Sequence, residues 1–284
     1  MPYVRIDLGP MGTTSTLQEF HRLNSPYIWQ GITDDLGNTF RDNFCAEAGL
    51  TKSTKKSSRK SAKKNEGAET DVPGVLDVRK LARITFKYDP NSVIHGLFLE
   101  KVSGRLRLSR ALTSFIEARN VSMAESGGVK IDRVMPSPKA FGTDGPKLDA
   151  SAGFGNVPFH RTEFTAEEIV AYFNLDLALL RGYGLPQPAV NFLVCLCIFK
   201  IQRFLSNGLR LRTACDFMTV GIPEVTNPVS LVFPDERTVG AMIASSLADC
   251  KGKGLFAHPA VTRMAWIPSQ QGQTTTEDTE LTDD

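Results

Sequence analysis

The order of strand-like and helix-like segments predicts an α+β fold, in which helices cover an antiparallel sheet. Residues 4–8 (VRIDL) alternate apolar and polar side chains and precede Gly9-Pro10, a pattern typical of a short first strand. Further strand and helix patterns follow without the regular strand–helix–strand repeat of a doubly wound parallel sheet. The 284 residues, 41% hydrophobic and 23% charged, suffice for one large domain, which we expect to span residues 1–268.

The next segments predict a loop followed by two strands. Residues 15–29 (STLQEFHRLNSPYIW) are polar apart from their aromatics and are expected to form a loop. Residues 81–88 (LARITFKY) alternate with period two, and residues 93–101 (VIHGLFLEK) do so more loosely. Both are therefore expected to be strands, joined by a turn at Asp89-Pro90-Asn91.

Helix patterns alternate with further strands in the rest of the chain. Ser109 is expected to cap a helix to about residue 119, and Thr165 with Glu168 is expected to form a capping box for a helix to about residue 181. A helix that is apolar almost all round is expected from Pro186 or Pro188 to Ser206 and should be buried. The remaining expected elements are a central strand over 209–220, a helix over 238–247 and a final strand over 260–267.

Three segments stand apart from this core by composition. Residues 121–161 contain six glycines and four prolines, and a loop of about forty residues inside a domain is usually functional or disordered. Residues 51–64 (TKSTKKSSRKSAKK) carry seven cations and no acid, within a flexible insert expected over 51–72. The tail, 269–284, carries five acids and no base, and is expected to be disordered. The basic insert is either a solubilising linker or an arm beside a polyanion, and its composition allows both.

Several functional classes find no support in the sequence. The longest apolar stretch, residues 189–199, is far shorter than the roughly 20 residues of a membrane span, and the N-terminus has no apolar segment of the secretory kind. The five cysteines have no metal-ligand spacing, so free thiols in a reducing cytoplasm are expected. Phosphate-loop, hydrolase and zinc-protease motifs are absent from the sequence, and we expect no cofactor and no metal.

Arg and Lys accumulate at the ends of elements and in loops, which favours a phosphate backbone as partner if they converge. Arg210 and Arg212 alternate on a strand, which places both on one face. The other basic positions are Arg22, Lys101, Arg105, Arg107, Arg110, Lys130, Arg133 and Lys139. Scattered surface charge explains any one of them equally well.

Three blocks resemble a known family. They are STLQEFHRLNSPYI (15–28), SVIHGLFLEKVSGRLRLSRALTSFIEA (92–118) and FTAEEIVAYFNLDLALLRGYGL with FLSNGLRLRTACDF (164–185 and 204–217). Together they resemble the Csb-type backbone subunit of CRISPR Cascade complexes of type I-U, now I-G, in the RAMP superfamily. The resemblance implies a modified RRM or ferredoxin-like core with inserted arms and a non-catalytic role in antiviral defence. Copies would stack head-to-tail along one CRISPR RNA in the cytoplasm, beside other Cascade subunits, with target DNA held through pairing to the guide.

The resemblance also implies where the RNA lies. His21, Arg22, Asn24 and Ser25 match the family's loop after the first strand, and Lys101, Arg105 and Arg107 match its basic junction. A subunit that accepts any guide sequence must contact phosphate and 2′-hydroxyl groups. Residues 121–161 are the expected thumb-like arm, with Lys130, Arg133 and Lys139 facing RNA by composition and position. The predicted strands show no aromatic pair of the RNP kind, which favours contacts to the backbone over base stacking.

Two other functions stay open at this point. A metal-dependent endoribonuclease of the same superfamily would use a loop acid such as Asp34 or Asp35. A small-molecule enzyme would need a cluster of acid and base residues that the sequence does not display. A further hypothesis pairs the basic residues 51–64 of one copy with the acidic residues 277–284 of another, or with DNA.

Overall fold

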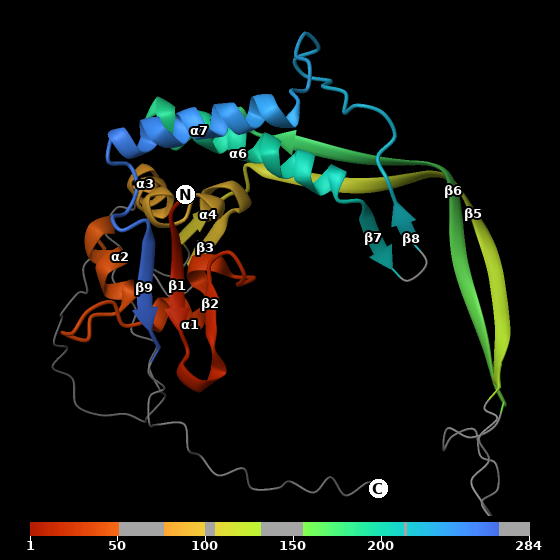
Figure 1. Ribbon diagram of the computed structural model, residues 1–284, viewed down its shortest axis with the longest axis horizontal. Coiled ribbons are helices and arrows are strands. Elements are labelled where there is room, and N and C mark those ends of the chain that lie inside the picture. Colours follow the sequence, from red (N-terminus) through yellow and green to blue (C-terminus); the bar gives the residue numbers. More distant parts are fainter. Residues whose placement is uncertain (51–76, 100–105, 132–155, 213–214, 267–284) are drawn as a thin grey trace, which may run out of the picture. The chain divides into compact units, whose positions relative to one another are not determined.

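The computed structural model describes residues 1–50, 77–99, 106–131, 156–212 and 215–266. It divides into two compact units, Met1–Thr113 with Phe173–Asp284 (unit 1) and Ser114–Tyr172 (unit 2). Helices and small, mostly antiparallel sheets confirm the α+β class (Figure 1). The basic insert 51–72 and the acidic tail 269–284 lie outside the described residues.

The first sheet of unit 1 has the strand order β2–β1–β9, with β1 Tyr3–Asp7, β2 Thr13–Ser15 and β9 Val261–Ala265. Both terminal strands predicted from the sequence, near residues 4–8 and 260–267, are confirmed. The pair β1–β2 is antiparallel, whereas β1 and β9 are parallel, which the prediction of an antiparallel sheet did not include. Val4, Ile6 and Met264 are buried on one face of this sheet, and Arg5 and Arg263 are exposed on the other.

The segment after β2 is more ordered than expected. The 3₁₀ helix η2, Arg22–Asn24, and the short helix α1, Pro26–Gln30, lie where a loop was predicted, and another 3₁₀ helix, η1 Gly9–Met11, lies between β1 and β2. Helix α2, Phe40–Ala48, starts with a capping box between Thr39 and Asp42 and ends at Gly49, whose φ of 71° lies in the left-handed region. Trp29, Phe40 and Phe44 then pack together, with ring centroids 5.4–6.0 Å apart.

The two central strand predictions were partly wrong. Residues 81–88 belong to the helix α3, Val78–Tyr88, whose first N–H groups are capped by the Asp77 carboxylate. Residues 93–95 belong to the helix α4, Pro90–His95. Of the predicted strand 93–101, the described residues Leu97–Leu99 form a strand, β3, paired antiparallel with β4, Leu106–Leu108. The expected turn at Asp89-Pro90-Asn91 is the start of α4, with Asp89 as its cap.

The long apolar helix was predicted correctly. Helix α6, Gln187–Ser206, packs on helix α7, Glu236–Gly252, and the shorter helix α5, Leu177–Gly182, precedes α6. By length and composition α6 passes as a membrane span, yet its buried side chains, Phe192 and Leu193 among them, belong to the core of unit 1. The predicted strand 209–220 is instead the hairpin of β7, Leu209–Arg212, and β8, Cys215–Phe217.

Two predicted helices are strands. Residues 112–119 lie in β5, Leu112–Ile131, so the helix from Ser109 was wrong. Residues 165–175 lie in β6, Asn156–Leu175, so the helix from Thr165 was wrong up to there, whereas its last part, from residue 177, is helical in α5. The two strands form a two-stranded sheet, where the sequence suggested a loop over 121–161. The residue before β5 and the residue after β6 lie next to each other, because the Asp176 N–H donates to the Ala111 carbonyl at 2.8 Å.

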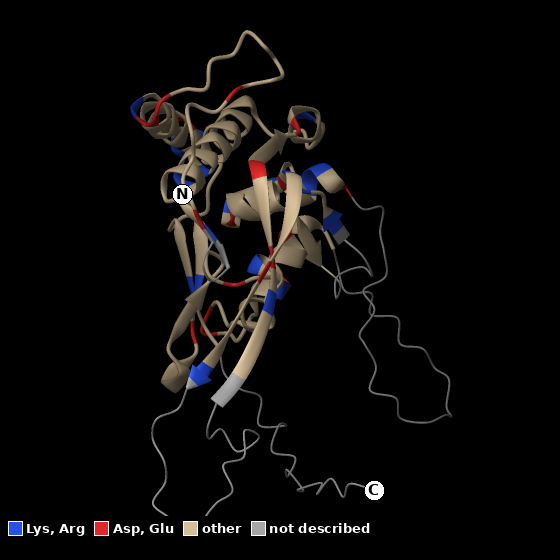
Figure 2. Cartoon of the chain, turned by 90° about the vertical axis from the view of Figure 1, so that its right-hand side faces the viewer, with Lys and Arg blue, Asp and Glu red and all other residues tan. Residues whose placement is uncertain are grey.

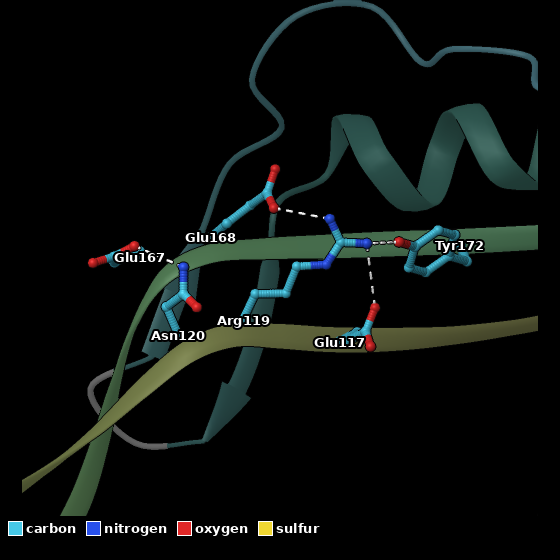
Figure 3. A network of polar contacts seen from close by, with 6 residues as sticks. All are labelled: Glu117, Arg119, Asn120, Glu167, Glu168 and Tyr172. Carbon is cyan, nitrogen blue, oxygen red and sulfur yellow. Dashed lines mark hydrogen bonds and ion pairs between the residues drawn. The ribbon is translucent and has the colours of Figure 1, made fainter.

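Unit 2 consists of most of these two strands, and polar contacts join them (Figure 3). The Arg119 guanidinium lies 3.0 Å from Glu168 on β6 and also contacts the Tyr172 hydroxyl on that strand, whereas Glu117, 3.4 Å away, lies on β5 with Arg119. The Asn120 amide donates to Glu167 at 2.8 Å. These cross-strand pairs explain why residues 165–175 form a strand: Thr165 and Glu168 are used between strands and not as a helix cap.

Candidate nucleic-acid interface

Arg22 is the centre of a basic cluster in unit 1. Its guanidinium donates to the carbonyl oxygens of His95, at 3.2 Å, and Gly96, at 2.7 Å. The backbone at Arg22 has φ of 49°, a left-handed conformation that non-glycine residues adopt rarely and at a free-energy cost. Its Nε is buried without a hydrogen-bond partner in the described structure. A strained backbone holds this arginine where its guanidinium binds two carbonyl oxygens.

Lys200 joins this cluster from the core helix α6. Its ammonium lies 2.8 Å from His95 Nε2, so the ammonium donates and the imidazole accepts through an unprotonated Nε2. Burial first, and then the charges of Lys200, Arg22 and Arg110, lower the pKa of His95 to about 4. His95 is therefore neutral at pH 7, and the positive charge in the cluster comes from lysine and arginine.

Arg110, which follows the β3–β4 hairpin in the chain, is the third cation of the cluster around Arg22. Gly96 has φ of 81°, and a Cβ there would lie 2.9 Å from the Leu108 carbonyl and 3.1 Å from Arg110 Cγ. Glycine at position 96 thus lets the chain around Arg110 approach the carbonyls that hold Arg22. Arg110 is exposed, and its charge contributes to lowering the pKa of Arg22, after the larger effect of burial.

One buried carboxylate faces the cluster. Asp89 is fully buried and accepts hydrogen bonds from the Asn91 N–H at 3.0 Å and the Ser92 hydroxyl at 2.7 Å. Burial raises its pKa, against the lowering effects of these bonds and of Arg22 and Lys200. Among the residues that the structure describes there, three cations, Arg22, Arg110 and Lys200, therefore face one carboxylate that is already hydrogen-bonded. Such an excess of positive charge in a partly desolvated site favours an anion of the phosphate type.

The β3–β4 hairpin adds an exposed aromatic beside an arginine. Leu97 and Leu99 point into the core, whereas Phe98 stays 38% exposed opposite Arg107 in the antiparallel register. The Arg107 guanidinium lies over the Phe98 ring, 5.0 Å from its centroid. A ring with a guanidinium on a strand suits a nucleotide, because the pair can contact both a base and a phosphate.

The structure separates the residues predicted to contact RNA after the first strand. Arg22 lies in the cluster, and His21 is exposed next to it in the chain. Asn24 is half-buried, and Ser25 is fully buried, so the Ser25 hydroxyl does not face solvent. Of the predicted basic junction, Arg107 lies on the hairpin, whereas Lys101 and Arg105 lie outside the described residues. Arg210 is exposed on β7, and the side chain of Arg212 is not described.

The described part of the predicted thumb-like arm, residues 121–131 and 156–161, carries Lys130 and Arg161 and one acid, Glu125. Lys130 is exposed on β5, and Arg133 and Lys139 lie outside the described residues. Acids outnumber Lys and Arg in the described residues of unit 2: Glu117, Glu125, Glu163, Glu167 and Glu168 against Arg119, Lys130 and Arg161. Lys and Arg residues are instead spread over several elements of the chain (Figure 2). The RNA contacts predicted for Lys130, Arg133 and Lys139 stay predictions.

Asp34 and Asp35, the acids considered for endoribonuclease chemistry, do not form part of a metal-binding group in the described residues. The Asp34 carboxylate accepts from the N–H groups of Leu36 and Asn38 and from the Asn38 amide, at 2.9–3.1 Å, and these bonds lower its pKa. Asp35 is exposed beside it. Within the described ranges, no three His, Cys, Asp or Glu side chains are placed to hold one metal ion. Asp34 therefore acts as the cap of its own turn.

Lys200 was not predicted from the sequence to belong to the site, and His95 was predicted to be a structural residue of a strand. A lysine that follows eleven mostly apolar residues in a buried helix was the available signal, because buried lysines are rare unless they have a partner. The partner, His95, is 105 residues away in the chain and meets Lys200 only in the folded state.

Comparison with known proteins bears on the first part of the chain, which holds every residue of the cluster except Lys200. No curated protein matches the chain. Residues 1–123 match the family model described as CRISPR-associated protein GSU0053. The first 123 residues are therefore similar to a family of CRISPR-associated proteins.

Proposed function

We propose that the chain is a guide-RNA-binding backbone subunit of a type I interference complex of the Cascade kind. In this role copies line up head-to-tail along the CRISPR RNA in the cytoplasm, beside other Cascade subunits. They hold the guide for pairing with target DNA and carry out no catalysis themselves. The observation that carries the proposal is the cluster of Arg22, Arg110 and Lys200, with one buried acid among them.

The chemistry of the cluster supports a sequence-independent partner. Arginine and lysine recognise phosphate through charge and hydrogen bonds, and phosphates are the same in every guide. Among the described residues of the β3–β4 hairpin, Phe98 supplies the one aromatic ring, and a ring stacks on any base. The site thus has the properties that a subunit serving many guide sequences requires.

The position of the cluster in the chain supports the same proposal. Arg22, His95, Arg107 and Arg110 all lie within the matched residues 1–123, and within the blocks that resemble a Cascade backbone subunit. The arm of unit 2 would then contact a neighbouring copy or the guide through residues that include Lys130. The endoribonuclease alternative has no observation of its own in the described residues.

The first experiment is purification of the chain co-expressed with a CRISPR array, followed by sequencing of the bound nucleic acid. RNA of repeat and spacer composition is the expected result. Protein free of RNA under these conditions contradicts the proposal.

A second experiment tests the cluster itself with the double variant Arg110→Gln, Lys200→Gln. Binding to two unrelated single-stranded RNAs is measured by fluorescence anisotropy over a series of salt concentrations. Removal of each phosphate contact should reduce the slope of log K against log salt by about 0.7. The matched control is Arg237→Gln, Lys253→Gln, one arginine and one lysine exposed at α7. A weakening confined to one of the two RNAs is the result that argues against contacts to the backbone.

A further inference from the structure

The open face of the sheet β2–β1–β9 presents a second set of polar groups that the basic cluster does not use. Side chains alternate along β1, so that Val4 and Ile6 are buried and Arg5 and Asp7 are exposed. Tyr3 is half-buried at the start of this strand. The face thus carries an aromatic ring and a guanidinium two residues apart on a central strand.

Two arginines meet on this face at the same level. Arg5 on β1 is the register partner of Arg263 on the parallel strand β9, and both are exposed. Like charges directly opposite each other on neighbouring strands destabilise a sheet. Arg5 donates to the Thr13 hydroxyl at 3.3 Å, and neither arginine forms an ion pair with a carboxylate of the described residues. An anion between the two guanidinium groups would remove their repulsion.

The acids close to this face are mostly engaged. Asp7 accepts a hydrogen bond from the Gly9 N–H at 2.9 Å, and Asp34 accepts from its own turn. Asp35 is exposed at the rim of the same hollow. The two arginines therefore have more unused hydrogen-bonding capacity than the neighbouring carboxylates.

Two shallow hollows cover the face and share Arg5 and Thr13. One, of about 400 Å³, is lined by Tyr3, Arg5 and polar residues of β2 and the segment after it. The other, of about 450 Å³, reaches from Arg5 across to Arg263 and the Asp34 turn. Ligand sites begin at about 300 Å³, so each hollow is large enough for a nucleotide. Threonine and serine hydroxyls and the two guanidinium groups line them, and the second hollow also includes Asp7, Asp34, Asp35 and the apolar Ile32, Met264 and Ala265. The hydroxyl and guanidinium groups are those that can bind a sugar–phosphate strand.

We propose that this face binds a stretch of single-stranded guide RNA, with a phosphate between Arg5 and Arg263 and the Tyr3 ring against a neighbouring nucleotide. This inference rests on the proposed function, because it names the guide RNA as the occupant. It adds a contact surface that lies on β1 and β9, separate from Arg22, Arg110 and Lys200.

The test compares the double variant Arg5→Gln, Arg263→Gln with the unmodified chain in the same anisotropy assay with labelled single-stranded RNA. Without the two guanidinium groups, binding should weaken by about tenfold and the salt slope should fall by about 0.7. Arg237→Gln, Lys253→Gln is again the control. Because the two surfaces are distinct, combination with Arg110→Gln, Lys200→Gln should multiply the two fold-changes.

Ultraviolet crosslinking of RNA to the unmodified chain gives a measurement that needs no substitution. The expected product is a nucleotide attached to the peptide that contains Tyr3. Equal RNA affinity of the folded Arg5, Arg263 variant and the unmodified chain, with crosslinks elsewhere, overturns the inference and leaves the proposed function standing. An unmodified chain that binds no RNA overturns both. A variant that keeps RNA affinity and loses only target-DNA binding by the loaded complex overturns the choice of guide RNA as occupant.

Discussion

The depressed pKa of His95 makes the stability of the protein depend on pH in a defined window. The pKa of an unperturbed histidine is about 6.5, and the pKa of His95 in the folded chain is about 4. The unfolded chain therefore binds a proton at this residue more readily than the folded one. The contribution of His95 to stability is complete above pH 6.5 and is lost as the pH falls from 6.5 towards 4.

The size of the effect follows from the two pKa values. Between pH 8 and pH 5, proton uptake by the unfolded chain alone lowers the free energy of unfolding by about 2 kcal/mol. Because the imidazole of His95 is only partly buried, solvent screening reduces this to roughly 1–2 kcal/mol. The cause is physical: a proton on Nε2 would end the hydrogen bond from Lys200 and place two cations 2.8 Å apart.

The assay is urea unfolding at pH 8 and pH 5 of the unmodified chain and of His95→Gln. The glutamine amide oxygen can still accept from Lys200, and the side chain does not titrate. The variant should lose roughly 1–2 kcal/mol less between the two pH values than the unmodified chain. His21→Gln, at an exposed position, controls for the loss of an imidazole. Equal losses in the unmodified chain and in His95→Gln would refute the reasoning.

Three further predictions concern the same region and the core. Lys200→Met should raise the pKa of His95, because it removes the largest of the neighbouring charges that lower it. An NMR titration of the imidazole signals measures this pKa, and a value that stays at about 4 contradicts a contribution from Lys200. Phe192→Ala should lower the free energy of unfolding by about 3–5 kcal/mol, whereas Phe20→Ala, at a side chain 94% exposed, should change it by less than about 0.5 kcal/mol in the same urea experiment. Gly96→Ala should destabilise the chain by more than about 1 kcal/mol and weaken RNA binding, because its Cβ would meet the Leu108 carbonyl; normal stability and affinity would contradict the packing at this glycine.

The sequence predicted well those elements that a single pattern defines. The apolar helix that ends at Asn207-Gly208 is α6, and the strands at the two ends of the chain are β1 and β9. In each case the pattern had one physical interpretation: an apolar surface all round a helix, or a short alternating segment beside a turn. What the sequence could not supply was that β1 and β9, more than 250 residues apart, pair in parallel.

The errors lie where two periods fit the same residues. In residues 81–88 the apolar positions alternate, yet Leu81, Ile84 and Thr85 also share one helix face, and the Asp77 cap decides for the helix. In residues 112–119 and 165–175 apolar residues also occur at helical spacing, as with Leu112 and Phe115 or Ile169 and Phe173. Contacts between two distant segments, such as Arg119 with Glu168, decide for strands there, and a local pattern does not contain them.

The candidate site was predictable only in its individual residues. Arg22 was singled out from its place in the chain, and its function as a carbonyl-bound cation beside Lys200 depends on three elements that meet in space. Ser25 shows the opposite outcome, since a polar residue in the expected contact loop is fully buried. Burial of a small hydroxyl has no signature in a single sequence.

The hydrogen bond from Asp176 to Ala111 allows residues to be removed from or added to β5 and β6 without separating the ends of unit 1 that flank them. The two points at which the polypeptide departs for β5 and returns from β6 are already joined, so the core chain does not depend on what lies between them to bring its ends together. Excision of residues 114–172 would need a linker of only a few residues, and closing so short a loop carries little entropy. Equally, residues added in pairs to the two strands would lengthen unit 2 while the hydrophobic core of unit 1 stayed the same. The length of the two-stranded sheet is therefore a property that insertions and deletions can alter independently of the rest of the fold.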